Sequence, residues 1–184
     1  MRAVTNRLDP SHTDGYWLTE TESAQAFDDL VDGLSGLFRV YREVEGRYQH
    51  FRPHQQLKTA VIDRILVPTS ALKEHGWTLG PVGVELKASD KKLGPGLNQL
   101  LDYSNATWNI NGNWVVPEWY FLWPAYKFTG PLQSVLAGRR CGGAYRDQYG
   151  QLIFHSASIL AKLAPGNIDP RPHNANHGQK VGSR

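Results

Sequence analysis

The sequence contains a single cysteine, Cys141, among its 184 residues. One cysteine excludes an internal disulfide, a Cys-rich zinc site and a cysteine-ligated iron–sulfur cluster. No run approaches the roughly 18–20 apolar residues that a membrane helix needs, and the N-terminal residues lack the apolar core of a signal peptide. We therefore expect a cytoplasmic protein without a membrane partner.

The composition is that of a folded domain, with 40% hydrophobic, 11% aromatic and 20% charged residues. This length favours one domain, since about 100–200 residues per domain is usual. The charge is unevenly distributed: residues 1–36 sum to −5, residues 37–164 to +6 and residues 165–184 to +2. A basic body is compatible with a polyanionic partner, although many basic proteins bind no nucleic acid.

The hydrophobic pattern alternates between helix and strand periods, which indicates an α/β or α+β domain around one mixed sheet. Thr19 and Glu22 form a capping-box pattern before a helical run. The expected helices span 20–34, 96–108 and 156–163, and the expected strands span 37–45, 60–67, 82–88 and 114–126, followed by a hairpin over 142–155. We expect an N-terminal extension over 1–18, a domain over 19–164 and a disordered basic tail over 165–184.

Charged residues interrupt two of the expected strands. Asp63 lies in an apolar run, and Glu85 and Lys87 lie two residues apart in the next strand, on one face. Burying an unpaired charge costs several kcal/mol, and two neighbouring carboxylates repel each other unless a cation lies between them. Mg²⁺ suits such a pair, because it binds one or two carboxylates together with water and phosphate oxygens. The pattern indicates metal-assisted phosphodiester hydrolysis.

The arrangement of Asp63 and Glu85-Leu86-Lys87 within helix–strand–strand–strand–helix resembles the PD-(D/E)XK nuclease superfamily. The chain departs from the usual pattern at Ile62, the position before the aspartate. Gln99 and Tyr103 form a Gln-x-x-x-Tyr pattern that is similar to the motif of the RecB-like branch. The resemblance covers about residues 20–126 and implies a restriction-endonuclease-like mixed sheet flanked by helices.

The resemblance also implies roles for individual residues. Asp63 and Glu85 would bind Mg²⁺ or Mn²⁺ with the Leu86 carbonyl, and Lys87 would be the catalytic lysine. Gln99 and Tyr103 would support that lysine and contact the DNA backbone. Glu43 would match an extra acidic residue of many members, a role that Glu45 or Glu22 could take instead.

These observations together predict a small Mg²⁺-dependent deoxyribonuclease, in which Lys91 and Lys92 are candidate phosphate contacts. Alternatives are a catalytically inactive nucleic-acid-binding protein with the same fold and a non-enzymatic partner-binding domain. The charged strand residues also have a plainer interpretation. Asp63 and Lys87 would then form a cross-strand ion pair on a solvent-facing sheet, with Glu85 paired to Arg64 or Lys58.

Overall fold

The computed structural model of the chain describes residues 19–48, 57–88, 93–125 and 130–169. Its first helix, α1 (Glu20–Asp32), begins where the capping pattern predicts. The Thr19 hydroxyl accepts from the Glu22 amide, and the Glu22 carboxylate accepts from the Thr19 amide at 2.9 Å. Phe27 and Val31 form its buried face, at helical spacing.

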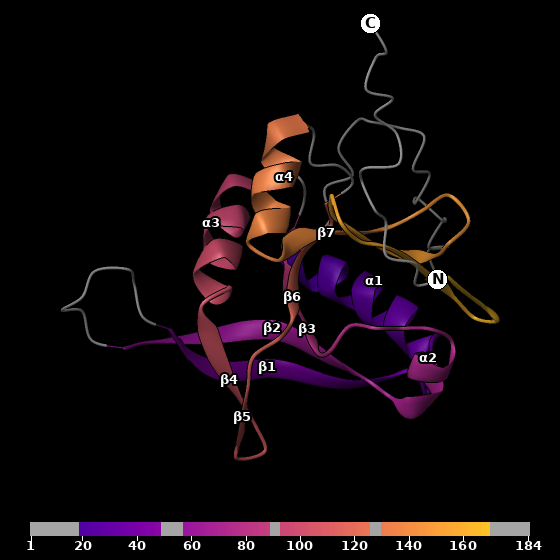
Figure 1. Ribbon diagram of the computed structural model, residues 1–184, viewed down its shortest axis with the longest axis horizontal. Helices are drawn as coiled ribbons and strands as arrows, with labels where there is room; N and C mark the ends of the chain where they lie inside the picture. Colours follow the sequence, from indigo (N-terminus) through magenta and orange to yellow (C-terminus); the bar gives the residue numbers. More distant parts are fainter. Residues whose placement is uncertain (1–18, 49–56, 89–92, 126–129, 170–184) are drawn as a thin grey trace, which may run out of the picture.

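Ten strands of the described residues form one mixed sheet, in the order β10-β9-β8-β7-β6-β3-β2-β1-β4-β5 (Figure 1). The strands β3, β6 and β7 are parallel to one another, and the other neighbours are antiparallel. The chain is therefore an α+β domain, as the sequence predicts. The strands are β1 (Phe38–Tyr48), β2 (Lys58–Pro68), β3 (Val82–Leu86), β4 (Ala106–Ile110), β5 (Asn113–Val115), β6 (Trp119–Trp123), β7 (Cys141–Arg146), β8 (Leu152–His155), β9 (Leu160–Ala164) and β10 (Asn167–Asp169).

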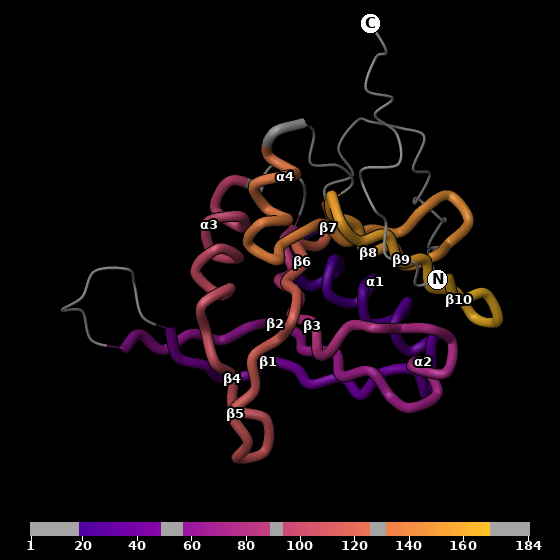
Figure 2. The backbone as a smooth tube through the Cα atoms, in the orientation of Figure 1, coloured from indigo at the N-terminus to yellow at the C-terminus, as the bar shows by residue number. Residues whose placement is uncertain are grey.

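Helices cover both faces of this sheet, as Figure 2 shows. On one face, α1 lies between the β1–β3 part and the β7–β10 part, and residues of all these regions share one apolar cluster. On the other face, α3 (Leu93–Tyr103) and α4 (Gly130–Gly138) pack on a second cluster that contains Ile65, Trp108 and Leu122. The short α2 (Ser70–Glu74) connects β2 to β3. The sheet thus separates two cores.

The first strand is longer than expected and changes face along its length. The sequence predicts an end at Gly46 and one shared face for Phe38, Val40 and Val44, but β1 continues to Tyr48. Phe38 packs in the α1 cluster, whereas Val44 packs in the α3 cluster. Between them, Glu43 has a positive φ of 49°, which interrupts the regular alternation of faces. A non-glycine residue in this conformation carries no clear sequence signal.

Gly46 lies inside β1 because the Trp108 ring covers it. A Cβ at this position would come within 2.2 Å of the ring. We expect Gly46→Ala to lower the free energy of unfolding by about 1–3 kcal/mol, since the ring and its neighbours must shift. Urea denaturation measures this change. Gly138→Ala in α4 is the matched control, because nothing lies within 4 Å of a Cβ there, and a helical alanine should leave stability equal or higher. Equal effects of the two substitutions would contradict this account.

The second expected helix is shorter than its pattern. The sequence predicts a helix over 96–108, but α3 ends at Tyr103 and β4 starts at Ala106. Residues 106–110 alternate between buried and exposed, and this period of two matches a strand. The Asn111-Gly112 turn then leads into β5, and the single strand expected over 114–126 is divided, because β5 ends at Val115 and β6 begins only at Trp119, after Pro117. Pairing with β1 decides against the helix here.

The prediction of a helix over 156–163 is wrong. Residues 160–164 form β9, which pairs with β8. The Ser156 hydroxyl accepts from the Ser158 and Ile159 amides, as in a helix cap, but the Ser156 amide donates to the Ile159 carbonyl and closes a turn. The predicted hairpin over 142–155 is confirmed by the pairing of β7 with β8.

The ends of the chain bear on the predicted domain limits. β10 pairs with β9, so residues 167–169 belong to the sheet rather than to a tail that begins at 165. Residues 170–184 and the predicted extension 1–18 lie outside the described residues. Within the described ranges, none of the helices has both the length and the apolarity for a membrane crossing.

Candidate active site at the divergence of two strands

Asp63 and Glu85 lie where β2 and β3 stop pairing. The antiparallel ladder ends at Arg64 opposite Val84, and the same register, continued by one residue, places Asp63 opposite Glu85. Beyond this point the Asp63 Oδ2 atom accepts a hydrogen bond of 2.7 Å from the Leu86 amide. A carboxylate has therefore replaced the backbone as partner of β3. The structure brings together the two acids that the sequence singles out.

Glu85 is the buried member of this pair, with 2% of its surface exposed. Its Oε1 atom accepts a hydrogen bond from Lys87 Nζ at 2.5 Å. Its Oε2 atom is buried and has no hydrogen-bond partner within the described part of the chain. A buried carboxylate oxygen without a hydrogen-bond partner destabilises the protein. A ligand that binds this oxygen would remove that cost.

The pKa values report the proximity of the two carboxyl groups. Burial, followed by the negative charge of Asp63, raises the pKa of Glu85 to about 7, against the opposing effect of Lys87. Burial also raises the pKa of Asp63, and the Leu86 amide and the Lys87 charge oppose that rise. Both groups therefore resist ionisation as they stand. A cation between them would reverse this effect, because it favours the charged forms.

Helix α3 packs against the Lys87 side chain and limits its movement. A Cβ added at Gly96 would lie 3.2 Å from the Lys87 Cγ atom and 2.9 Å from Leu122, so the backbone of the helix approaches the lysine stem closely. The Lys87 side chain is 15% exposed. Its ammonium group is thus confined beside Glu85 and still reaches the surface.

Glu20 is a residue near the site that the sequence analysis missed. Its charge, in the first turn of α1, contributes to raising the pKa of Asp63. This end of α1 is fixed on the sheet, because Trp123 Nε1 donates to the Ser23 carbonyl at 3.1 Å. An acidic residue directly after an N-cap is normally explained by its favourable interaction with the helix dipole. The sequence alone therefore gives no signal that Glu20 lies near Asp63.

The acidic residues considered as an additional ligand are exposed or already occupied. Glu43 and Glu45 are exposed on β1, and Glu22 accepts the Thr19 amide in the capping box. In the ranges that the structure describes, no three His, Cys, Asp or Glu side chains form a group arranged to hold a metal ion. The role of Glu43 as a metal ligand stays a prediction.

The Gln-x-x-x-Tyr pattern connects α3 to β2. Tyr103 is buried, and its hydroxyl donates to the Val61 carbonyl at 2.8 Å, two residues before Asp63. Gln99 Nε2 donates to the same hydroxyl at 2.6 Å. Burial raises the pKa of Tyr103 to about 12, and the charges of Glu85 and Asp63 act in the same direction. The geometry gives Tyr103 a positioning contact to β2, whereas the predicted DNA contacts of Gln99 and Tyr103 stay predictions.

Tyr103→Phe tests this positioning contact. The substitution leaves the Val61 carbonyl and the Gln99 amide without their shared partner, and we expect a loss of about 1–2 kcal/mol in the free energy of unfolding. Urea denaturation measures the loss, and Tyr149→Phe, on an exposed turn, serves as the control. A Tyr103→Phe variant as stable as the wild type would show that the contact contributes nothing.

Arg64 anchors the Asp63 backbone to α1 on the opposite face. Its guanidinium binds both oxygens of Asp28, at 2.8 and 2.9 Å, and also donates to the Asp63 carbonyl at 2.7 Å. The plainer pairing considered above is therefore wrong in its details. Arg64 pairs with Asp28 and not with Glu85, while Lys87 pairs with a buried Glu85 and not on a solvent-facing sheet.

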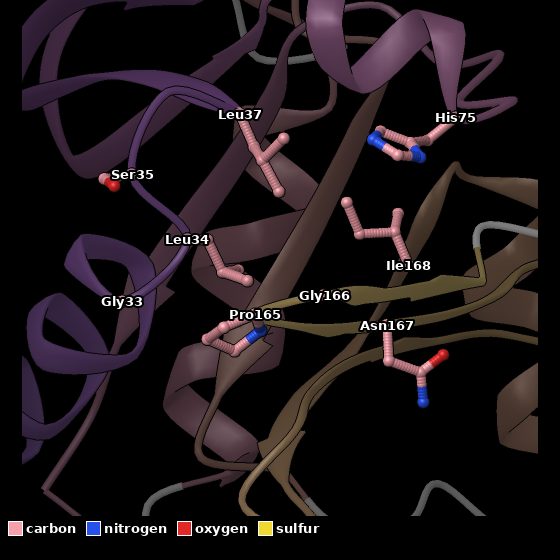
Figure 3. A pocket seen from close by; sticks show the side chains of 9 residues that line it. All are labelled: Gly33, Leu34, Ser35, Leu37, His75, Pro165, Gly166, Asn167 and Ile168. Atoms are coloured by element: carbon pink, nitrogen blue, oxygen red, sulfur yellow. The ribbon is translucent and has the colours of Figure 1, made fainter.

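Lys91 and Lys92, the candidate phosphate contacts, lie outside the described residues. A pocket of about 530 Å³ lies at the other end of α1, where Leu34, Leu37 and His75 face the β9–β10 turn (Figure 3). Its lining contains no carboxylate, so it is distinct from the acidic pair.

Comparison of the chain with protein-family models, with curated proteins and with solved structures finds no match.

Proposed function

We propose that this protein is a metal-dependent nuclease that hydrolyses DNA phosphodiester bonds at Asp63, Glu85 and Lys87. The observation that carries the proposal is the pair of adjacent carboxylates, one of them with a buried and unpartnered oxygen, beside an ammonium group. The order α1, β1, β2, β3, α3 around this pair, with the short α2 inserted between β2 and β3, supports the resemblance to PD-(D/E)XK nucleases.

The donor set fits Mg²⁺ or Mn²⁺. Asp63 and Glu85 would hold the ion through hard oxygen atoms, of which Glu85 Oε2 accepts no hydrogen bond in the described ranges. The Leu86 carbonyl is the third ligand that the resemblance implies. When bound, the ion supplies Lewis acidity for water attack at phosphorus.

Side chains of the protein would stabilise the developing charge and hold the two carboxylates in position. The Lys87 ammonium group lies beside Glu85, where it would stabilise the charge that develops on the phosphate oxygens. Arg64 and Tyr103 hold the β2 backbone on either side of Asp63, through the Asp63 and Val61 carbonyls. These contacts keep the two carboxylates at a constant separation, on which catalytic geometry depends.

Cleavage assays test the proposal directly. Plasmid, linear duplex and single-stranded DNA are incubated with wild type, Asp63→Asn or Glu85→Gln, in Mg²⁺, in Mn²⁺ and in EDTA. We expect cleavage by the wild type only, and only with metal, because both substitutions remove a charged ligand. Equal cleavage by all three proteins would point to a contaminant.

The same assays separate the alternatives. DNA retention without cleavage under any metal condition would favour the inactive nucleic-acid-binding protein. Absence of both binding and cleavage would favour the partner-binding domain. Either result would overturn the nuclease proposal.

A further inference from the structure

On one face of the sheet beyond α1, several of the described side chains are exposed to solvent. Trp108 covers Gly46, so the neighbouring Arg47 projects from the opposite face of β1. Side chains level with Arg47 in the sheet register, or level with Glu45 two residues before it, are exposed across four strands of the sheet. They are Thr59 and Val61 on β2, Glu45 on β1, Thr107 and Asn109 on β4, and Trp114 on β5.

This is the face on which α1 lies. Val44 and Gly46 pack against the α3 side of the sheet, whereas Arg42 bonds to Asp28 of α1 at 3.2 Å. Arg47 therefore shares the α1 face, past the end of the helix that carries Glu20. Figure 1 shows β4 and β5 at this edge of the sheet, beside β1.

Trp114 and Arg47 form the chemically distinctive part of the open face. The Trp114 side chain is 49% exposed, and the Arg47 guanidinium carbon lies 5.1 Å from its ring centroid. The two residues come from strands separated by β4, so the sheet itself sets their contact. The cation holds the ring in place, which leaves an indole surface and a guanidinium edge available together.

We propose that this surface, Arg47 with Trp114 and the flanking Thr59, Thr107 and Asn109, binds single-stranded nucleic acid. Single-strand binders combine an aromatic group, on which a base stacks, with a cation that contacts the backbone. Hydroxyl and amide side chains are common phosphate contacts. The basic body of the chain, +6 over residues 37–164, complements a polyanion.

The surface lies near the acidic pair along the sheet but on the opposite face, because Lys87 packs against α3. In the sheet register, Asp63 is level with Glu43, and Trp114 is level with Glu45, two residues farther along and three strands away. At about 3.3 Å per residue along a strand and about 4.8 Å between neighbouring strands, the positions of Asp63 and Trp114 are roughly 16 Å apart in the plane of the sheet. A strand bound at Trp114 would have to pass to the α3 face of the sheet to reach Lys87, which packs against that helix. The path of the strand to Lys87 rests on the proposed nuclease function, whereas binding at Trp114 does not.

Fluorescence anisotropy with labelled oligo-dT of 20 nucleotides tests the inference, in EDTA so that no cleavage occurs. We expect Trp114→Ala to weaken binding about tenfold or more, and Trp114→Phe to retain most of the affinity, because base stacking is worth about 1–3 kcal/mol. Arg47→Gln should weaken binding several-fold and lower its salt dependence. Tyr149→Ala is the matched control, since Tyr149 is a 77% exposed aromatic on the β7–β8 turn. Oligo-U and duplex DNA of the same length identify the nucleic acid preferred.

Every outcome bears on the inference. Circular dichroism checks that each variant is folded, since the substituted side chains are exposed. Unchanged affinity in Trp114→Ala and Arg47→Gln, or an equal loss in Tyr149→Ala, would overturn the proposed surface even if the wild type cleaves DNA. Trp114-dependent binding without any cleavage would support the surface and remove the nuclease proposal. Failure to bind any oligonucleotide, with self-association that Trp114→Ala abolishes in light scattering, would assign the face to a second copy of this chain.

Discussion

Replacing Lys87 with methionine should reduce metal-dependent DNA cleavage by roughly 10²–10⁴-fold, the range typical for loss of a positioned charged or proton-transferring group. The ammonium group is the cation beside Glu85, at 2.5 Å, and its side chain is still 15% exposed. Methionine keeps an unbranched stem under Gly96, so the packing of α3 should survive. The effect should fall on kcat, since the group acts on charge that develops during the reaction.

Steady-state cleavage of a labelled duplex measures this change. Lys73→Met, an exposed lysine on α2, is the matched control and should behave as wild type. Lys87→Arg retains the charge and should recover part of the rate. A Lys87→Met protein that is folded and cleaves at the wild-type rate would remove Lys87 from the mechanism.

The metal-free protein should lose stability as the pH rises, which is the reverse of the usual behaviour of paired carboxylates. The pKa of folded Glu85 is about 7, above its ordinary value of 4.5, so the folded state binds more protons than the unfolded state between these values. Its contribution is complete below about pH 4.5 and is lost as the pH passes 7. A shift of this size corresponds to about 3 kcal/mol. Asp63, whose pKa is also raised, acts in the same direction.

Urea denaturation in EDTA at pH 5 and pH 8 measures the effect. Glu85→Gln should abolish most of the pH dependence and should be more stable than wild type at pH 8, because the buried charge is gone. A wild type that is equally stable at both pH values would contradict the burial of two repelling carboxylates.

Added Mg²⁺ should restore the stability of the wild type at pH 8. A ligand at 100 times its Kd stabilises the folded state by about 3 kcal/mol, which for a chain of this size raises Tm by several degrees. Glu85→Gln should show little or no rise. A rise of equal size in both proteins would place the binding of Mg²⁺ elsewhere.

The sequence contained strong local signals for several parts of the fold. The capping box at Thr19 and Glu22 defines the start of α1, and the Pro residues at 117 and 124 bracket β6. Asp63, Glu85 and Lys87 stood out because a charge in an apolar strand has a large desolvation cost. These features depend on neighbours in the chain or on transfer energies, and both can be read without a structure.

Other parts depended on contacts between distant segments. Residues 106–110 have both helical and strand character, and pairing with β1 makes them β4. Residues 160–164 become β9 because β8 offers an edge, although their spacing fits a helix. Glu43 changes the face of β1 through a positive φ, which moved Val44 to the second core.

What the sequence determined by itself was therefore the set of chemical groups and their local elements: two acids, a lysine, a capped helix and several apolar strands. Only the tertiary structure decided which of these groups meet. It placed Asp63 opposite Glu85, brought Glu20 close enough to act on Asp63, assigned Arg64 to Asp28, and joined Arg47 to Trp114. The physical reason is that register and crossing of strands arise from the burial of whole faces, a property of the complete sheet rather than of any segment.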